Sequence, residues 1–180
     1  MKLYIETQRL ILREIRESDV DGMFELDSNT EVHKYLGNNP IKNKKEAENI
    51  IQFIKEQYKE RGIGRLAVIE KKSGNFIGWS GFKLNKGKKE TLNGFDKFID
   101  IGYRFIPKYW KNGYGLETAI ACLDFGFKKL NYNIIYGAAD VKNVGSNKIL
   151  QKIGLQFVNE FEHHNVKVNW YQLKKENYEK

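Results

Sequence analysis

The stretch from Phe98 to Lys129 constrains the fold more than any other part of the sequence. Apolar and polar residues alternate over residues 98–106, as they do in a strand whose two faces have different surroundings. One face holds Ile99, Ile101, Tyr103 and Phe105, and the other holds Asp100, Gly102 and Arg104. After Pro107, a helix is expected from about Gly113 to Lys129. A strand followed by a helix in this way predicts a sheet covered by helices.

The rest of the chain supplies further strands and helices in an order typical of an α/β protein. Ser18 is a candidate N-cap for a helix over the following residues, and residues 44–58 have apolar positions at helical spacing. The expected strands are residues 10–13, 65–70, 76–84, 133–139, 157–162 and 168–173, and a short helix is expected over 146–153. The pattern predicts an α/β (α+β) fold with a mixed central sheet, in one domain spanning residues 1–180.

Composition excludes several classes of protein. The chain has 180 residues, of which 41% are hydrophobic, and no stretch has the length of a membrane span. Cys122 is the only cysteine, which excludes a disulfide framework and a cysteine-rich zinc site, and it is expected to be an inert core residue. The three histidines show no metal-ligand spacing with it. We therefore expect a cytoplasmic protein without a metal.

The formal net charge of +8 is unevenly distributed. Residues 1–40 contain five Lys/Arg against eight Asp/Glu, whereas residues 83–111 contain eight Lys/Arg against three Asp/Glu. A positive middle segment attracts either a polyanion such as a nucleic acid or a small phosphorylated ligand. A lysine-rich solvated surface explains the same numbers, and charge alone leaves the choice open.

A glycine pair lies where the helix after Pro107 begins, in the sequence Lys111-Asn112-Gly113-Tyr114-Gly115-Leu116. The first N–H groups of a helix have no intrahelical acceptor and, with the helix dipole, form an anion site. Glycine allows positive φ and a close approach of the backbone to a ligand. The segment matches neither a P-loop nor G-x-G-x-x-G, because Thr118 stands in place of the third glycine. A phosphate loop and a simple tight turn both remain open.

Three segments in this order resemble the GNAT-type N-acetyltransferase superfamily, and more narrowly its ribosomal-protein (RimJ/RimL-like) branch. They are FIDIGYRF from Phe98, PKYWKNGYGLETA from Pro107 and NVGSNKILQKIGL from Asn143. The opening TQRLILREIRESD and the GNFIGWSGFK hairpin also fit, so the resemblance covers nearly the whole chain. One position departs from the family pattern, because Trp110 stands where Gln or Arg is usual.

The resemblance implies the GNAT fold and acetyl-CoA as co-substrate. It implies that the pyrophosphate is held by the backbone N–H groups of Lys111, Asn112, Gly113, Tyr114, Gly115 and Leu116. The pantetheine arm would run beside the strand ending at Arg104, Phe105 and Ile106. Asn143 would hydrogen-bond the arm or the acetyl end.

The catalytic candidates follow from the chemistry of acetyl transfer, which needs a neutral amine and a proton for the leaving thiolate. Asp100 is the first candidate base, directly or through water, with a solvated strand charge as the plain alternative. Ser146 matches the serine of the family's N-x-x-S motif and is the candidate acid, with a helix N-cap as its alternative. Weaker base candidates on the terminal strand pair are Glu160, Glu162, His163 and His164. Tyr109 and Trp110 either line a ligand channel or pack in the core.

The leading acceptor is a protein N-terminal α-amine. Neutralising a lysine-like amine at pH 7 costs about 4.6 kcal/mol, against about 1 kcal/mol for an α-amine. A small-molecule amine, such as a polyamine or an aminoglycoside-like compound, is the enzymatic alternative. The resemblance implies that the first helices help to wall the acceptor cleft, so the acidic segment 1–40 would suit a cationic acceptor. A non-catalytic ribosome- or nucleic-acid-binding module is the alternative of another class, although the lysines of residues 83–89 lack an aromatic platform. A homodimer is also considered.

Overall fold

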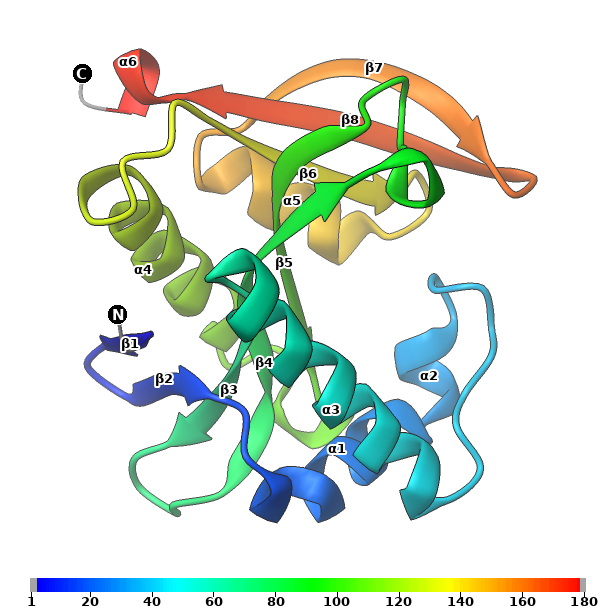
Figure 1. Ribbon diagram of the computed structural model, residues 1–180, viewed down its shortest axis with the longest axis vertical. Coiled ribbons are helices and arrows are strands. Elements are labelled where there is room, and N and C mark those ends of the chain that lie inside the picture. The colour runs from blue at the N-terminus through cyan, green and yellow to red at the C-terminus, as the bar shows by residue number, and fades with distance from the viewer. Residues whose placement is uncertain (1–2, 179–180) are drawn as a thin grey trace.

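An eight-stranded mixed sheet forms the centre of the molecule, as described by a computed structural model for residues 3–178. The strand order is β1-β2-β3-β4-β5-β6-β8-β7 (Figure 1). All neighbouring strands are antiparallel except β5 and β6. The strands are β1 (Tyr4–Glu6), β2 (Leu10–Glu14), β3 (Arg65–Glu70), β4 (Phe76–Lys86), β5 (Lys97–Phe105), β6 (Ile134–Asp140), β7 (Gln156–His163) and β8 (Val166–Lys174).

Helices cover both faces of this sheet. Two of them, α1 (Val20–Asp27) and α3 (Lys44–Arg61), form one core cluster with Ala67 of β3 and with Ile106, which follows β5. On the opposite face, α4 (Tyr114–Lys128) and α5 (Val144–Lys152) pack against the other side chains of the strands. Two short helices, α2 (Thr30–His33) and α6 (Lys175–Tyr178), complete the set. The α/β class and the mixed sheet flanked by helices are confirmed.

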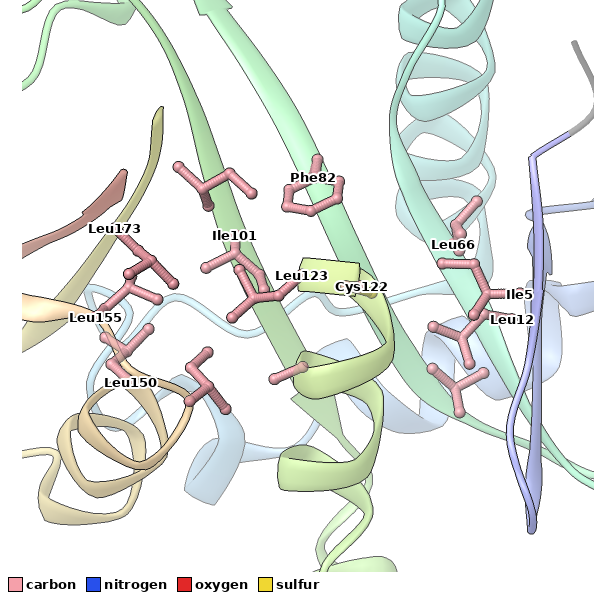
Figure 2. Close-up of a cluster of buried hydrophobic side chains, with 14 of the residues drawn as sticks. Ile5, Leu12, Leu66, Phe82, Ile101, Cys122, Leu123, Leu150, Leu155 and Leu173 are labelled. Carbon is pink, nitrogen blue, oxygen red and sulfur yellow. The ribbon is translucent and has the colours of Figure 1, made fainter. Parts of the chain in front are cut away.

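The larger core cluster lies beneath α4 and α5. Figure 2 shows Cys122 and Leu123 of α4 beside Phe82 and Ile101, which lie on the adjacent strands β4 and β5. Leucines from α5, from β8 and from the segment before β7 lie on one side of this helix, and Ile5, Leu12 and Leu66 lie on the other. Burial of these apolar side chains is the main favourable term that holds the helices on the sheet.

The sheet divides between its two parallel strands. β5 pairs with β6 at one register position, Asp100 with Tyr136. Beyond it, β5 continues to Phe105 along β4 without a strand on its other side. The backbone edge of residues 101–105 is therefore open toward the gap between the two halves of the sheet.

The order of the long elements predicted from the sequence is confirmed, and the differences lie at short elements and helix starts. β1, α2 and α6 are additional, and β7 and β8 extend beyond their predicted bounds. Ser18 is not an N-cap, because a short 3-10 helix occupies Glu17–Asp19 before α1. Asp19 accepts a hydrogen bond from Arg16 N at 2.8 Å and pairs with Arg13. A buried ion pair, not the serine hydroxyl, therefore organises this turn.

Candidate active site

The loop between β5 and α4 presents a row of free backbone donors. Within residues 3–178, the N–H groups of residues 111–116 have no hydrogen-bond acceptor, and the first bond into the loop runs from Glu117 N to Gly113 O at 3.0 Å. Lys111 and Gly113 have positive φ angles of 62° and 81°. Unpaired N–H groups at the start of a 15-residue helix form a site for an anion.

The two glycines that open α4 have different structural roles. Gly113 has a left-handed backbone, and a Cβ there would meet no atom closer than Arg9 Nη2, at 3.5 Å. Gly115 has no positive φ, but a Cβ there would lie 3.0 Å from Ile149 Cδ1 and 3.8 Å from Phe105 Cε2. Gly113 is therefore needed for the turn, whereas Gly115 lets α4 approach α5 and β5.

Arg9 fastens this loop to the N-terminal strands, a contact that the sequence analysis missed. Its guanidinium donates to Asn112 O at 2.9 Å and to Glu117 Oε2 at 2.7 Å, and it lies over the Tyr114 ring at 4.5 Å. Glu117 also accepts from Thr7 Oγ1 at 2.6 Å and from Arg9 N at 3.1 Å. Burial acts to raise the pKa of Glu117, but these hydrogen bonds outweigh it and the pKa is lowered.

Two side chains of the loop are bonded to neighbouring strands, while its backbone N–H groups have no such partner. The Tyr114 hydroxyl donates to Glu70 Oε1 at 2.6 Å, which turns this ring toward β3. Trp110 Nε1 donates to Phe105 O at 2.7 Å and ties the loop to the end of β5. Trp110 thus has a structural contact where the family pattern has a Gln or Arg.

One residue expected beside the pantetheine arm, Ile106, does not border the open edge of β5. Its side chain is buried in the cluster formed by α1 and α3. Its N–H donates to Ile77 O at 3.0 Å, and its carbonyl accepts from Tyr109 N at 2.9 Å. Both backbone groups are occupied, so Ile106 has nothing to offer an extended ligand. The open edge of β5 ends at Phe105, whose carbonyl is already bonded to Trp110 Nε1.

Asn143, not Ser146, is the N-cap of α5. Asn143 Oδ1 accepts a hydrogen bond from Ser146 N at 3.1 Å, so α5 begins at Val144 and includes Ser146. Asn143 Nδ2 donates no hydrogen bond to any residue that the structure describes. Asn143 therefore keeps a free amide donor beside the gap, while the N-cap alternative for Ser146 is wrong.

Ser146 instead contacts Tyr103 of β5. The tyrosine hydroxyl donates to Ser146 O at 3.1 Å and lies 3.2 Å from Ser146 Oγ. Burial raises the pKa of Tyr103 to about 12, so the phenol remains protonated at neutral pH. The sequence placed Tyr103 on the apolar face, which is correct, but gave no sign that its hydroxyl meets the N-x-x-S serine.

Asp100 lies on the opposite face of β5, where the two halves of the sheet separate. Its carboxylate accepts from Arg65 Nη2 at 2.6 Å and from Asn85 Nδ2 at 2.9 Å, one bond to each oxygen. Its side chain is largely buried, with 20% exposed. Asp100 is therefore a fixed carboxylate, not the solvated strand charge considered as its alternative.

Arg104 lies further along the same face as Asp100. Its guanidinium is bonded to the buried carboxylate of Asp27 on α1 and lies 5.0 Å from the Trp79 ring. His33 Nε2 is 3.6 Å from the same Asp27 oxygen. The Arg104 side chain thus connects β5 to the first helices, and its backbone groups face β4.

Most acidic side chains of the N-terminal segment have a basic partner. Glu6, Glu17, Asp19, Asp21, Glu25 and Asp27 each form an ion pair with a Lys or Arg side chain. The side chains of Glu6, Glu17 and Asp21 are still more than half exposed, so the expectation that the acidic segment 1–40 suits a cationic acceptor stays a prediction.

The other candidate residues lie on the terminal strand pair. His163 is the last residue of β7 and His164 lies in the turn to β8, while Glu160 pairs with Lys167 at 3.1 Å. Cys122 is fully buried, and burial raises the pKa of its thiol to about 12, as expected for an inert core residue. Within residues 3–178, no group of three or more His, Cys, Asp or Glu side chains has the geometry of a metal site, and no helix is long and apolar enough to cross a bilayer.

Comparison with known proteins agrees with this geometry. Residues 9–156 match the family model described as an acetyltransferase (GNAT) domain. The chain is 31% identical over 152 residues to the uncharacterized N-acetyltransferase YoaA of Bacillus subtilis (strain 168), covering 84% of this chain and 82% of the relative.

Solved structures share the fold at lower identity. The ribosomal-protein-S5-alanine acetyltransferase from Vibrio fischeri superposes with a TM-score of 0.76 at 16% identity, covering 98% of each chain. Spermidine N-acetyltransferase from Vibrio cholerae, in complex with CoA and spermine, gives 0.75 at 16% identity, covering 97% of this chain and all of the other. Since both kinds of enzyme match equally well, the fold itself does not choose between a protein and a polyamine acceptor.

Proposed function

The chain belongs to the GNAT acetyltransferase family, and on that premise we propose that it transfers the acetyl group of acetyl-CoA to the N-terminal α-amine of a protein. The observation that best supports acetyl-CoA is the continuity of two features. The open edge of residues 101–105 ends next to the loop whose N–H groups are free at residues 111–116.

These features suit the two parts of the co-substrate. A pantetheine arm has amide groups that can pair with the unpaired backbone of β5, as an added strand does. A pyrophosphate is an anion that suits free N–H groups at a helix N-terminus, with Lys111 at the rim. Phe105 can contribute its N–H to this pairing, because its carbonyl already accepts from Trp110 Nε1, while the backbone groups of Arg104 face β4. Asn143 has an amide donor for the arm or the acetyl oxygen.

The chemical step that we propose is direct attack. The neutral amine nitrogen bonds to the thioester carbonyl carbon, the C–S bond breaks, and the sulfur leaves as a thiolate. Asp100 receives the proton of the amine, directly or through water, and Ser146 gives a proton to the thiolate. Tyr103, whose phenol is protonated and in hydrogen-bond contact with Ser146, can orient the serine hydroxyl. Asp100 then loses its proton to solvent and Ser146 regains one from solvent, so both side chains return to their starting state.

The α-amine is preferred for a reason taken from this site. Both oxygens of Asp100 already accept a hydrogen bond, which suits an acceptor that needs little help to lose its proton, about 1 kcal/mol at pH 7 for an α-amine. A small-molecule amine is the second candidate because spermidine acetyltransferase shares the fold.

Release of free thiol from acetyl-CoA tests the proposal. The acceptors are peptides with a free N-terminus and no lysine, the same peptides blocked at the N-terminus but containing lysine, and spermidine. We expect turnover with the first set alone. Turnover confined to the lysine peptides or to spermidine would show that the acceptor is not an α-amine. No turnover with any amine would refute the enzymatic proposal in favour of a non-catalytic binding module.

A further inference from the structure

Arg65 of β3 reaches across two strands to the start of the open edge. Its guanidinium donates to Gly81 O on β4 at 2.5 Å, to Asp100 O on β5 at 3.1 Å and to Asp100 Oδ2 at 2.6 Å. The side chain is 13% exposed. Arg65 therefore binds both the backbone and the carboxylate of Asp100.

The surroundings of this guanidinium are shaped to receive it. A Cβ at Gly102 would lie 2.8 Å from Arg65 Cζ, so this glycine leaves the space that the guanidinium fills. The Trp79 ring lies 5.2 Å from Arg65 Cζ. Asn85 holds the second oxygen of Asp100. The carboxylate is thus fixed at both oxygens, at the register position where β5 last meets β6.

Stability alone is a weak reason for this arrangement. Burying an ion pair costs desolvation free energy, and replacing such a pair by apolar residues often leaves stability unchanged or raises it. A planar guanidinium, with several donors in a fixed fork, matches three acceptors at once, which an ammonium group cannot do in the same geometry. These contacts fix the orientation of the Asp100 carboxylate.

We propose that Arg65 is a positioning residue for acetyl transfer, which holds Asp100 at the start of the open β5 edge so that its carboxylate can take the proton of the acceptor amine. The inference rests on the proposed function, because it assumes that Asp100 receives this proton. Arg65 itself touches neither the co-substrate nor the acceptor.

Two variants test it, with kcat and the KM for acetyl-CoA measured on an α-amine peptide at pH 7 and pH 9. Arg65→Lys keeps the charge and loses the fork, while Gly102→Ala keeps Arg65 but displaces its guanidinium. Arg61→Lys is the matched control, because Arg61 is similarly buried and binds Glu90 and Leu84 O away from the site.

About one in seven α-amines of pKa about 7.8 is neutral at pH 7, and nearly all are neutral at pH 9. We therefore expect kcat of both variants to fall about sevenfold at pH 7 and to stay within about twofold of the unaltered protein at pH 9. The KM for acetyl-CoA and the activity of the Arg61→Lys control should not change.

Other outcomes would overturn the inference. Equal losses at both pH values would show a structural role, and unchanged activity of both variants at pH 7 would show that Arg65 does not act on Asp100. If Arg65→Lys does not fold, Gly102→Ala alone decides between these outcomes. An unaltered protein that acetylates no amine would overturn the proposed function, and this inference with it.

Discussion

Replacing Glu117 by Gln should loosen the loop that we assign to the pyrophosphate. Glu117 lies in the first turn of α4 and accepts hydrogen bonds from Thr7 and from the backbone and side chain of Arg9. The same Arg9 holds the carbonyl of Asn112. Glutamine keeps one acceptor oxygen, but it removes the charge and places an NH₂ group near the guanidinium.

The size of the effect follows from these contacts. A hydrogen bond to a charged group contributes about 1.5–3 kcal/mol, and exposed ion pairs contribute about 0–1 kcal/mol. Glu117 is mostly buried, whereas the Arg9 side chain is 44% exposed, so the Arg9 contribution lies at the low end. We expect the free energy of unfolding to fall by about 2 kcal/mol, which for a chain of this size lowers Tm by about 4–8 °C.

The sign of the pH dependence is fixed by the lowered pKa of Glu117. The folded state holds the carboxylate in its charged form, so the stabilisation is present above the ordinary value of 4.5 and is lost as the pH falls through the lower folded pKa. The difference in unfolding free energy between the unaltered protein and Glu117→Gln should therefore be largest at pH 7 and should disappear under more acidic conditions.

Urea unfolding and calorimetric titration with acetyl-CoA measure the two consequences. The matched control is Glu90→Gln, because Glu90 is equally buried and is bonded to Arg61, Lys83 and Lys86 N at the far end of β4. Both variants should lose stability, but only Glu117→Gln should bind acetyl-CoA more weakly, by about fivefold for a loss of about 1 kcal/mol. Equal affinity of the two variants for acetyl-CoA would refute the link between Arg9, Glu117 and the loop.

Two further predictions concern the co-substrate and the N-x-x-S segment. Acetyl-CoA at about 100 times its Kd should add about 2.7 kcal/mol of stability and raise Tm by about 5–11 °C, and Gly113→Pro should abolish the shift because proline cannot adopt the φ of 81°. No shift at millimolar acetyl-CoA, as read by thermal melting, would contradict the assigned site. Asn143→Ala should lower stability by about 1 kcal/mol through loss of the α5 cap, whereas Ser146→Ala should leave stability nearly unchanged and lower kcat. A Ser146→Ala enzyme with normal kcat would exclude Ser146 as the proton donor.

The long elements were predictable because their signals are local. The alternation over residues 98–105 gives both the strand and its two faces, and the spacing over residues 44–58 gives most of α3. Short elements such as β1 and α2 have three or four residues and form through tertiary contacts. The start of α5 was misplaced because Asn143 and Ser146 are both good N-cap residues, and sequence alone does not decide which one accepts the bond.

The site was predictable where it follows the chain and not where it joins distant segments. The loop after β5 was found from its glycines and from the family resemblance. The contact of Arg9 with Glu117 spans 108 residues, and that of Arg65 with Asp100 spans 35. The sequence around these four residues gives no sign of their partners, since arginine is ordinarily a solvated charge at the surface.

The division of the sheet also has a consequence for the cooperativity of unfolding. Strands β1–β5 form one hydrogen-bonded ladder and β6, β8 and β7 form another, joined at a single register position. Backbone hydrogen bonds therefore transmit little cooperativity between the two ladders. Side chains supply it instead, because Ile101 from the first ladder and Ile135 from the second belong to one cluster with Leu123 of α4. Thermodynamic coupling between the ladders is thus a property of the core beneath α4, and the backbone at the gap remains free to pair with a ligand.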